Sequence, residues 1–319
     1  FPYTPLFRSA VRASSIAAAP GTSAPPAGRA LWSGLALALI GSIGFSGKAI
    51  IVKLAYRYGV DAVTLIMYRM LFALPLFVLL AWWAGRGKAA LVRREWLMVG
   101  ALGFSGYYLA SFLDFAGLAY ITAGLERLIL YLNPTLVLGL GALLFKRRVG
   151  GRQVVALAVS YSGVLFVFGQ EVQLQGGNVA LGAALVFASA ISYALYLVYS
   201  GEEVKRLGAL RLTGLASSVA CVLCIAQFFM LRPLAAFAVA PEVVWLSVLN
   251  ATACTVAPVL MVMMAVERIG AAAAAQVGMV GPLSTILMAV VFLGEPFTSV
   301  MALGTVLVIA GIWLLTQWR

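Results

Sequence analysis

The feature that most constrains this chain is a series of apolar segments, each about 20 residues long, separated by short polar gaps. A helix of that length crosses a bilayer core of roughly 30 Å and satisfies its own backbone in lipid. The segments are continuous rather than alternating, which excludes a transmembrane barrel. We therefore predict an all-α integral membrane protein with ten transmembrane helices, at 31–54, 61–83, 95–118, 121–145, 151–169, 178–200, 210–231, 242–265, 270–293 and 298–318.

The basic residues indicate how these helices are oriented. Sixteen of the 22 Lys and Arg residues fall in segments on the N-terminal side of the membrane, three fall on the opposite side and three lie within the spans. Positive charge marks the cytoplasmic side, so both termini are expected in the cytoplasm of a bacterium, with the chain in its plasma (inner) membrane. The net charge of +12 is explained by insertion and by anionic inner lipids. The expected partner is the lipid bilayer, and no nucleic acid is expected.

The first thirty residues, 1–30, differ from the rest because they are rich in Ala, Pro, Ser and Gly and hold no apolar run. This composition predicts a disordered N-terminal tail. The opening residues, 1–9, resemble a translated sequencing adapter, and we interpret them as a candidate artefact.

An internal repeat divides the ten spans into five and five. Displacing the chain by 148 residues places Pro134 on Pro282 and Gly163 on Gly311. The repeats are expected at 31–169 and 178–318. Because five is odd, the second repeat enters the membrane from the opposite side, an arrangement that places a binding site at the midplane between the halves.

Four segments carry a resemblance to a known family: "GFSGKAIIVKLAY" (44–56), "YRMLFALPL" (68–76), "GLAYITAGLERLILYLNPTLVLGLGALLF" (117–145) and "ERIGAAAAAQVGMVGPLSTILMAVVFLGEP" (267–296). The chain resembles ten-helix, EamA-type members of the drug/metabolite transporter superfamily. The resemblance implies alternating access around a central cavity and export of amino acids or other small metabolites. Family members carry a Glu after the fourth and the ninth span; Glu295 fills the second place, and Arg147 occupies the first.

Two prolines predict helix breaks deep in the membrane. Pro134 lacks an amide hydrogen and frees the carbonyl of Leu130, and Pro282 does the same for Gly278. Freed carbonyls in lipid need a partner, so these breaks are candidate binding positions. The alternative is that the prolines only bend their helices. The polar residues beside the breaks, which we take as candidate substrate-binding residues, are Tyr131, Asn133 and Gln276.

Ionisable residues concentrate in the first four spans, at Lys48, Arg69, Asp114, Glu126 and Arg127. Charges in lipid are costly, so these side chains are expected to face inward and pair. Three cations against two carboxylates leave one positive charge, and we predict that Arg69 or Lys48 binds a substrate carboxylate. The alternative is a buried structural network of Asp114, Glu126 and Arg127, in which Glu126 is also a candidate for proton coupling.

Tyrosines on two spans are the candidates for an apolar cavity wall. Tyr193 and Tyr196 lie deep in the sixth span, where lining the site and simple packing are equally open. Tyr107, Tyr108 and Tyr199 lie nearer helix ends, where tyrosines commonly anchor at the membrane interface.

These features favour one function class over three others. The chain contains no His, no phosphate-binding glycine loop and no clustered catalytic groups, so we expect no enzyme activity, no cofactor and no metal. We predict a secondary transporter that exports amino acids or related small metabolites as a monomer or homodimer. The alternatives are a multidrug or organic-cation efflux protein and a non-transporting membrane receptor or assembly subunit.

Overall fold

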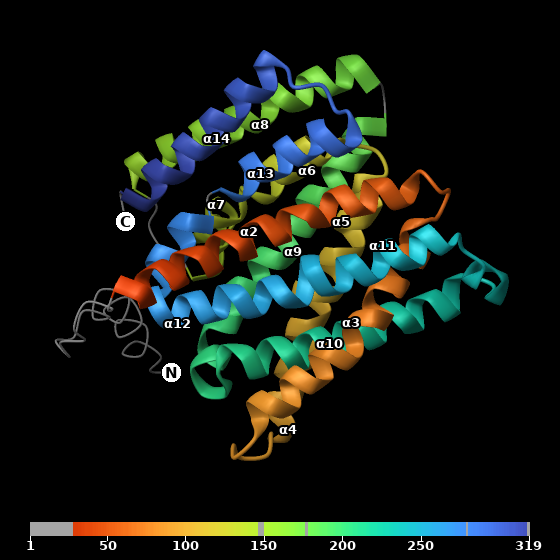
Figure 1. Ribbon diagram of the computed structural model, residues 1–319. Coiled ribbons are helices and arrows are strands. Elements are labelled where there is room, and N and C mark those ends of the chain that lie inside the picture. The colour runs from red at the N-terminus through yellow and green to blue at the C-terminus, as the bar shows by residue number, and fades with distance from the viewer. Residues whose placement is uncertain (1–27, 146–149, 176–177, 279, 318–319) are drawn as a thin grey trace.

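A computed structural model describes residues 28–145, 150–175, 178–278 and 280–317, and every regular element in these ranges is a helix (Figure 1). The expected all-α fold is confirmed. Three elements, η1, η3 and η4, are π-helical and η2 is a 3-10 turn. The elements are α2 (Gly28–Tyr56), α3 (Ala62–Gly85), α4 (Arg93–Leu102), η1 (Gly103–Leu109), α5 (Ala110–Leu118), α6 (Ala123–Leu130), α7 (Asn133–Phe145), α8 (Gly151–Gln175), α9 (Asn178–Leu207), α10 (Ala209–Leu231), η2 (Leu234–Phe237), α11 (Pro241–Ala251), η3 (Thr252–Val256), α12 (Ala257–Gly278), α13 (Gly281–Met288), η4 (Ala289–Leu293) and α14 (Ser299–Gln317).

Eight helical segments in the described ranges are long and apolar enough to cross a membrane. Two shorter apolar helices, Gly281–Leu293 and Ser299–Leu315, complete the series of ten. Several spans are composite: α4, η1 and α5 form one, α6 and α7 form another, and α11, η3 and the first part of α12 form a third.

The boundary between the eighth and ninth spans differs from the expectation. The sequence predicts a turn between 265 and 270, but α12 continues to Gly278. The segment 271–275 consists of five alanines, the residue with the highest helix propensity, which favours continuation past Gly270. The expected ninth span is therefore divided between the end of α12 and the α13–η4 segment.

The 148-residue repeat is visible in the elements themselves. Displaced by this amount, the π-helical segment η3 falls within η1, and both helix breaks coincide. The packing is also related: α2 lies against α12 as α9 lies against α5, while α3 pairs with α10 and α8 with α14 (Figure 1). Corresponding helix boundaries are the starts of α4 and α11 at Arg93 and Pro241, the starts of α8 and α14 at Gly151 and Ser299, the ends of α6 and α12 at Leu130 and Gly278, and the starts of α7 and α13 at Asn133 and Gly281.

Glycines set the close crossing of α8 and α14. A Cβ added at Gly163 would lie 2.6 Å from the carbonyl oxygen of Gly304, and one added at Gly311 would lie 2.7 Å from that of Ala156. Gly163 and Gly311 are repeat equivalents, so the two halves meet here through matching small residues. Small residues let helix backbones approach closely in lipid, where packing replaces the hydrophobic effect.

Gly163→Ala is therefore expected to lower the free energy of unfolding by about 1–3 kcal/mol, because backbone atoms must move apart to admit the methyl group. The matched control is Gly139→Ala, a helical glycine of α7 whose added Cβ would meet nothing within 4 Å. That change is expected to stabilise by about 0.5–1 kcal/mol. Thermal unfolding of both variants in detergent measures the difference, and equal stability would contradict the crossing described here.

Candidate functional site

A cavity of about 380 Å³ lies between the two repeats. Its wall is formed by α2, α3, the η1–α5 segment, α6, α7, α9, α10 and the η3–α12 segment, so both halves contribute. Most of the side chains expected at a site border this cavity: Lys48, Arg69, Asp114, Arg127, Tyr131, Asn133 and Tyr193.

Both predicted helix breaks are present, and the first of them borders this cavity. The α6 helix ends at Leu130 and α7 begins at Asn133, one residue before Pro134. In the second repeat α12 ends at Gly278 and α13 begins at Gly281, followed by Pro282.

A side chain of the first repeat satisfies the carbonyl freed in the second. The hydroxyl of Tyr131 donates to the carbonyl oxygen of Gly278 at 2.8 Å. Because Pro282 cannot bond to Gly278, this hydrogen bond replaces the missing helical one. Tyr131 was expected beside the carbonyl of Leu130, and the structure instead directs it to the opposite break.

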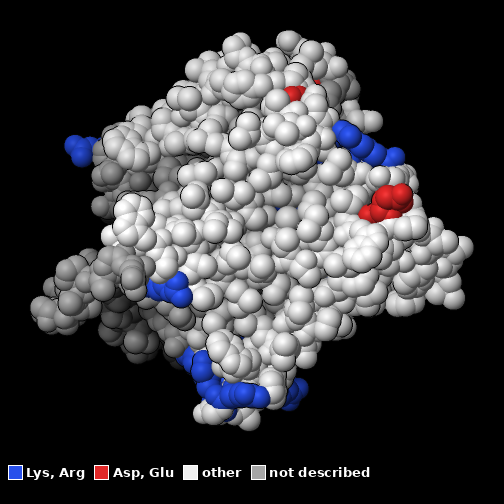
Figure 2. Space-filling view, viewed as in Figure 1, with Lys and Arg blue, Asp and Glu red and all other residues white. Residues whose placement is uncertain are grey.

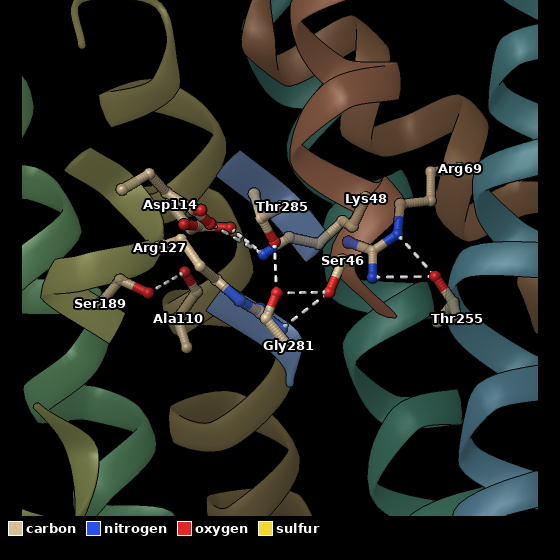
Figure 3. A network of polar contacts seen from close by, with 11 residues as sticks. Ser46, Lys48, Arg69, Ala110, Asp114, Arg127, Ser189, Thr255, Gly281 and Thr285 are labelled. Atoms are coloured by element: carbon tan, nitrogen blue, oxygen red, sulfur yellow. Dashed lines mark hydrogen bonds and ion pairs between the residues drawn. The ribbon is translucent and has the colours of Figure 1, made fainter. Parts of the chain in front are cut away.

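Ser46 of α2 connects the second break to the ionisable residues (Figure 3). Its hydroxyl lies 2.9 Å from the carbonyl oxygen of Gly281 as a donor and accepts from Arg127 Nη2 at 3.4 Å. The hydroxyl of Ser284 lies 2.8 Å from the same Ser46 oxygen. Sequence reasoning missed Ser46, since a serine in an apolar helix usually bonds its own backbone and gives no distinct signal.

Lys48 pairs with both carboxylates of the first repeat. Its Nζ lies 2.5 Å from Asp114 Oδ2 and 3.4 Å from Glu126 Oε1. Asp114 is 2% exposed and Glu126 is fully buried behind the cavity wall. A single ammonium shared by two buried carboxylates is typical of a structural ion pair, because loss of the cation would remove the nearest counter-charge of both acids.

Arg69 has no such partner among the described residues. Its Nε and Nη2 both donate to the hydroxyl of Thr255 at 3.2 Å, and its Cζ lies 5.1 Å from the ring centroid of Phe115. Within the described ranges no carboxylate lies at ion-pair distance from it, and Nη1 has no hydrogen-bond partner. The side chain is only 6% exposed, so this is a buried guanidinium held in place by neutral groups.

Thr255 is the site residue that sequence reasoning most clearly missed. It lies in the π-helical turn η3, and its hydroxyl donates to the carbonyl of Asn250, five residues earlier, at 2.8 Å. The equivalent turn of the first repeat, η1, contributes Tyr107 to the cavity wall. π-Helical turns often occur at functional sites, but apolar periodicity and helix propensity do not predict them.

The cavity also holds unpaired polar atoms of both kinds. Arg127 Nε and Arg69 Nη1 are buried donors without a partner, and Asp114 Oδ1 and Asn133 Oδ1 are buried acceptors without one. Buried polar atoms are normally hydrogen-bonded, so these atoms are available to bond water or a ligand in the cavity.

The tyrosines of the third and sixth spans differ in their position relative to the cavity. Tyr193 borders the cavity and stacks on Tyr196, with ring centroids 5.6 Å apart. Tyr196 lies behind it, with its hydroxyl 3.2 Å from that of Tyr107. Tyr107 therefore belongs to the wall and not to a membrane interface, whereas Tyr199 is 46% exposed, as expected for an interfacial anchor.

Two glutamates accept hydrogen bonds from the start of α6 and so fasten it in place. Glu295 accepts from the backbone N–H groups of Ala123 at 2.9 Å and Gly124 at 3.3 Å, and Glu171 accepts from the backbone N–H and hydroxyl of Thr122. Carboxylates are favourable at a helix N-terminus, where N–H groups are otherwise unpaired. Two residues noted in the sequence have no side-chain description: the side chain of Gln276 and the whole of Arg147 lie outside the described residues.

Comparison with known proteins gives three findings. The pattern of a family described as the EamA-like transporter family matches residues 32–169 and again 180–317. The uncharacterized transporter YcbK of Bacillus subtilis (strain 168) is 31% identical over 285 residues, which cover 85% of this chain and 89% of that protein. A solved crystal structure, 16% identical, matches the fold with a TM-score of 0.59 over 90% of this chain and 97% of that one.

Lys48→Met is expected to lower the free energy of unfolding by about 3–5 kcal/mol, because it leaves two buried carboxylates unpaired. Adding Asp114→Asn and Glu126→Gln should restore most of that loss. The matched control is Lys53→Met on the same helix: among the described residues Lys53 forms no ion pair and donates to the carbonyls of Leu118 and Ile121, and its loss should cost about 1 kcal/mol. Unfolding in mixed micelles measures all three, and equal losses at Lys48 and Lys53 would contradict the shared ion pair.

Proposed function

The chain belongs to the EamA-like transporter family, and on that premise we propose that it is a secondary transporter of amino acids or related small metabolites that carry a carboxylate. The family establishes a membrane transporter of the drug/metabolite type. The cavity supports the rest of the proposal, because inverted repeats with broken helices bind their substrate between the halves.

The observation that carries the proposal is the guanidinium of Arg69. It borders the cavity, is almost fully buried and keeps Nη1 without a partner. A buried charge without a counter-charge is costly unless a partner completes its bonds. A carboxylate is the natural partner, since the planar guanidinium presents its donors in a fork that matches two carboxylate oxygens.

The remaining groups of the cavity match the ammonium group and the side chain of an amino acid. Asp114 Oδ1 and Asn133 Oδ1 are acceptors at the cavity wall and would receive the N–H groups of a substrate ammonium. Met70, Phe77 and Tyr193 supply apolar wall for its side chain. A volume of about 380 Å³ is near the lower end of typical ligand pockets, which favours a small metabolite.

The charge at the cavity argues against an organic cation as the main substrate. Lys48 offsets part of the negative charge of Asp114 and Glu126, while Arg69 and Arg127 both border the cavity. A permanently charged cation would meet two guanidinium groups there. A receptor or assembly subunit is also disfavoured, because the chain matches a transporter family in both halves.

The fastening of α6 supports alternating access. We propose that the start of α6, which Glu295 and Glu171 hold, faces the outside, with both termini in the cytoplasm of a bacterium, in agreement with the distribution of basic residues. Release of substrate to the outside then requires these hydrogen bonds to open. Export is the direction that the resemblance implies.

Arg69→Gln is expected to weaken uptake of an amino acid by at least about thirtyfold, because it removes the charge that binds the carboxylate. Counterflow into proteoliposomes, with a panel of aromatic, aliphatic, basic and acidic amino acids, measures this. The methyl esters of the same amino acids provide a second test: wild type should discriminate strongly against the ester, and Arg69→Gln should not.

The matched control is Arg57→Gln, which removes an exposed arginine that donates to the carbonyl of Leu293. It should leave uptake unchanged. Wild-type uptake in a correctly inserted Arg69→Gln variant would contradict the carboxylate role, and uptake confined to organic cations would replace the proposal with drug efflux.

Glu295→Gln is expected to expose the cavity from the outside, because it removes the charge that fastens α6. Cys254 borders the cavity and reports its opening once Cys221 and Cys224 are changed to Ser. A membrane-impermeant thiol reagent added outside should label Cys254 about tenfold faster in the variant. Glu242→Gln, an exposed glutamate in the first turn of α11, is the control, and equal labelling in both variants would count against the fastening role.

A further inference from the structure

A second, larger recess lies outside the central cavity, between α3, α4 and α10. It has a volume of about 640 Å³, and its walls are almost entirely apolar. Along α3 it runs from Gly85 at one end to Leu74 at the other. At a rise of 1.5 Å per residue these positions are about 17 Å apart, close to half of a bilayer core of roughly 30 Å. The recess therefore has the depth of one leaflet.

The rim of this recess carries the residues that mark the membrane interface. Trp82 and Trp96 both line it and are 57% and 51% exposed. Tryptophan is enriched at the level of lipid headgroups, where its ring meets hydrocarbon and its N–H meets water. The end of the recess near Gly85 is thus the headgroup end, and the end near Leu74 reaches the middle of the hydrocarbon.

Three cations surround the headgroup end. Arg211 lines the recess and donates to the carbonyl of Ala89 at 3.0 Å, and Lys88 donates to that of Leu207 at 3.0 Å. The guanidinium of Arg86 lies 3.7 Å from the centroid of the Trp82 ring. Figure 2 shows Lys and Arg side chains gathered at this lower end of the molecule, where α3 ends and α4 begins in Figure 1.

These cations lack counter-charges within the part of the chain that the structure describes. None of the three forms an ion pair there, and the carboxylate of Glu95 is already bonded to Arg206 at 2.8 Å. Carbonyl oxygens and an aromatic ring hold the three side chains in position while leaving their positive charge uncompensated.

We propose that this recess, which we call the α3–α10 groove, binds an anionic phospholipid of the surrounding bilayer. An acyl chain fills the apolar length, and the phosphate lies among Arg86, Lys88 and Arg211. A chain of leaflet length with a negative headgroup matches both the depth and the charge of the groove. The bound lipid contacts α3, the helix that also carries Arg69, the residue proposed to bind a substrate carboxylate. The lipid site itself does not depend on the proposed transport function.

Native mass spectrometry of the purified full chain tests this. The probes are phosphatidylglycerol and phosphatidylcholine with identical acyl chains. The variant Arg86→Gln/Lys88→Gln/Arg211→Gln should bind phosphatidylglycerol about fivefold more weakly for each cation removed, with little change for phosphatidylcholine. Arg57→Gln, which also removes an arginine held by a carbonyl, is the matched control and should bind both lipids as wild type does.

A second pair of variants tests the acyl-chain part without altering charge. Val78 lines the groove and Leu79 does not, although the two are neighbours on α3 and are 50% and 56% exposed. Val78→Trp should fill the groove and displace phosphatidylglycerol, and Leu79→Trp should leave its binding unchanged. Retained binding in the triple variant, equal losses for the two lipids, equal effects of the two tryptophans, or competition by inorganic phosphate alone would each overturn the proposal.

Discussion

A bilayer core offers no water to a free backbone carbonyl, and that constraint determines how the two halves of this protein meet. Pro282 interrupts the second repeat and leaves Gly278 without its helical partner, and Tyr131 of the first repeat supplies the missing bond. Ser46 then bonds the carbonyl of Gly281 on the other side of the same break. The break between α12 and α13 is therefore held by side chains that cross the repeat interface, and one of them, Tyr131, also lines the cavity.

Within that frame the charges separate into two groups. Lys48 pairs with two carboxylates of the first repeat. Arg69 is held by Thr255 and an aromatic ring, which fix its position without satisfying its charge. A guanidinium that is positioned but uncompensated suits a ligand that arrives and leaves, whereas a permanent carboxylate partner would occupy it.

The sequence predicts this fold well wherever a single local rule decides the outcome. Apolar length predicts the spans, and proline predicts both breaks at Leu130 and Gly278. The cluster of Lys48, Arg69 and Asp114 follows from the cost of charge in lipid. Prediction fails where the outcome depends on distant partners or unusual turns. Thr255 enters the site through a π-helical turn, Tyr131 bonds the opposite break, and the alanines at 271–275 extend α12 through an expected turn.

The repeats match in their helix boundaries, their π-helical turns and their glycine crossing, but the charged side chains that line the cavity all belong to the first repeat. A perfectly symmetric pair of inverted halves would give an inward-facing and an outward-facing state of equal energy. Each state would be converted into the other by a two-fold rotation about an axis in the membrane plane. Charges that stay with one half remove that degeneracy. The asymmetric placement of Lys48, Arg69 and Asp114 therefore makes the two states unequal in energy, and an anion bound at Arg69 as proposed would change that difference by neutralising part of the charge.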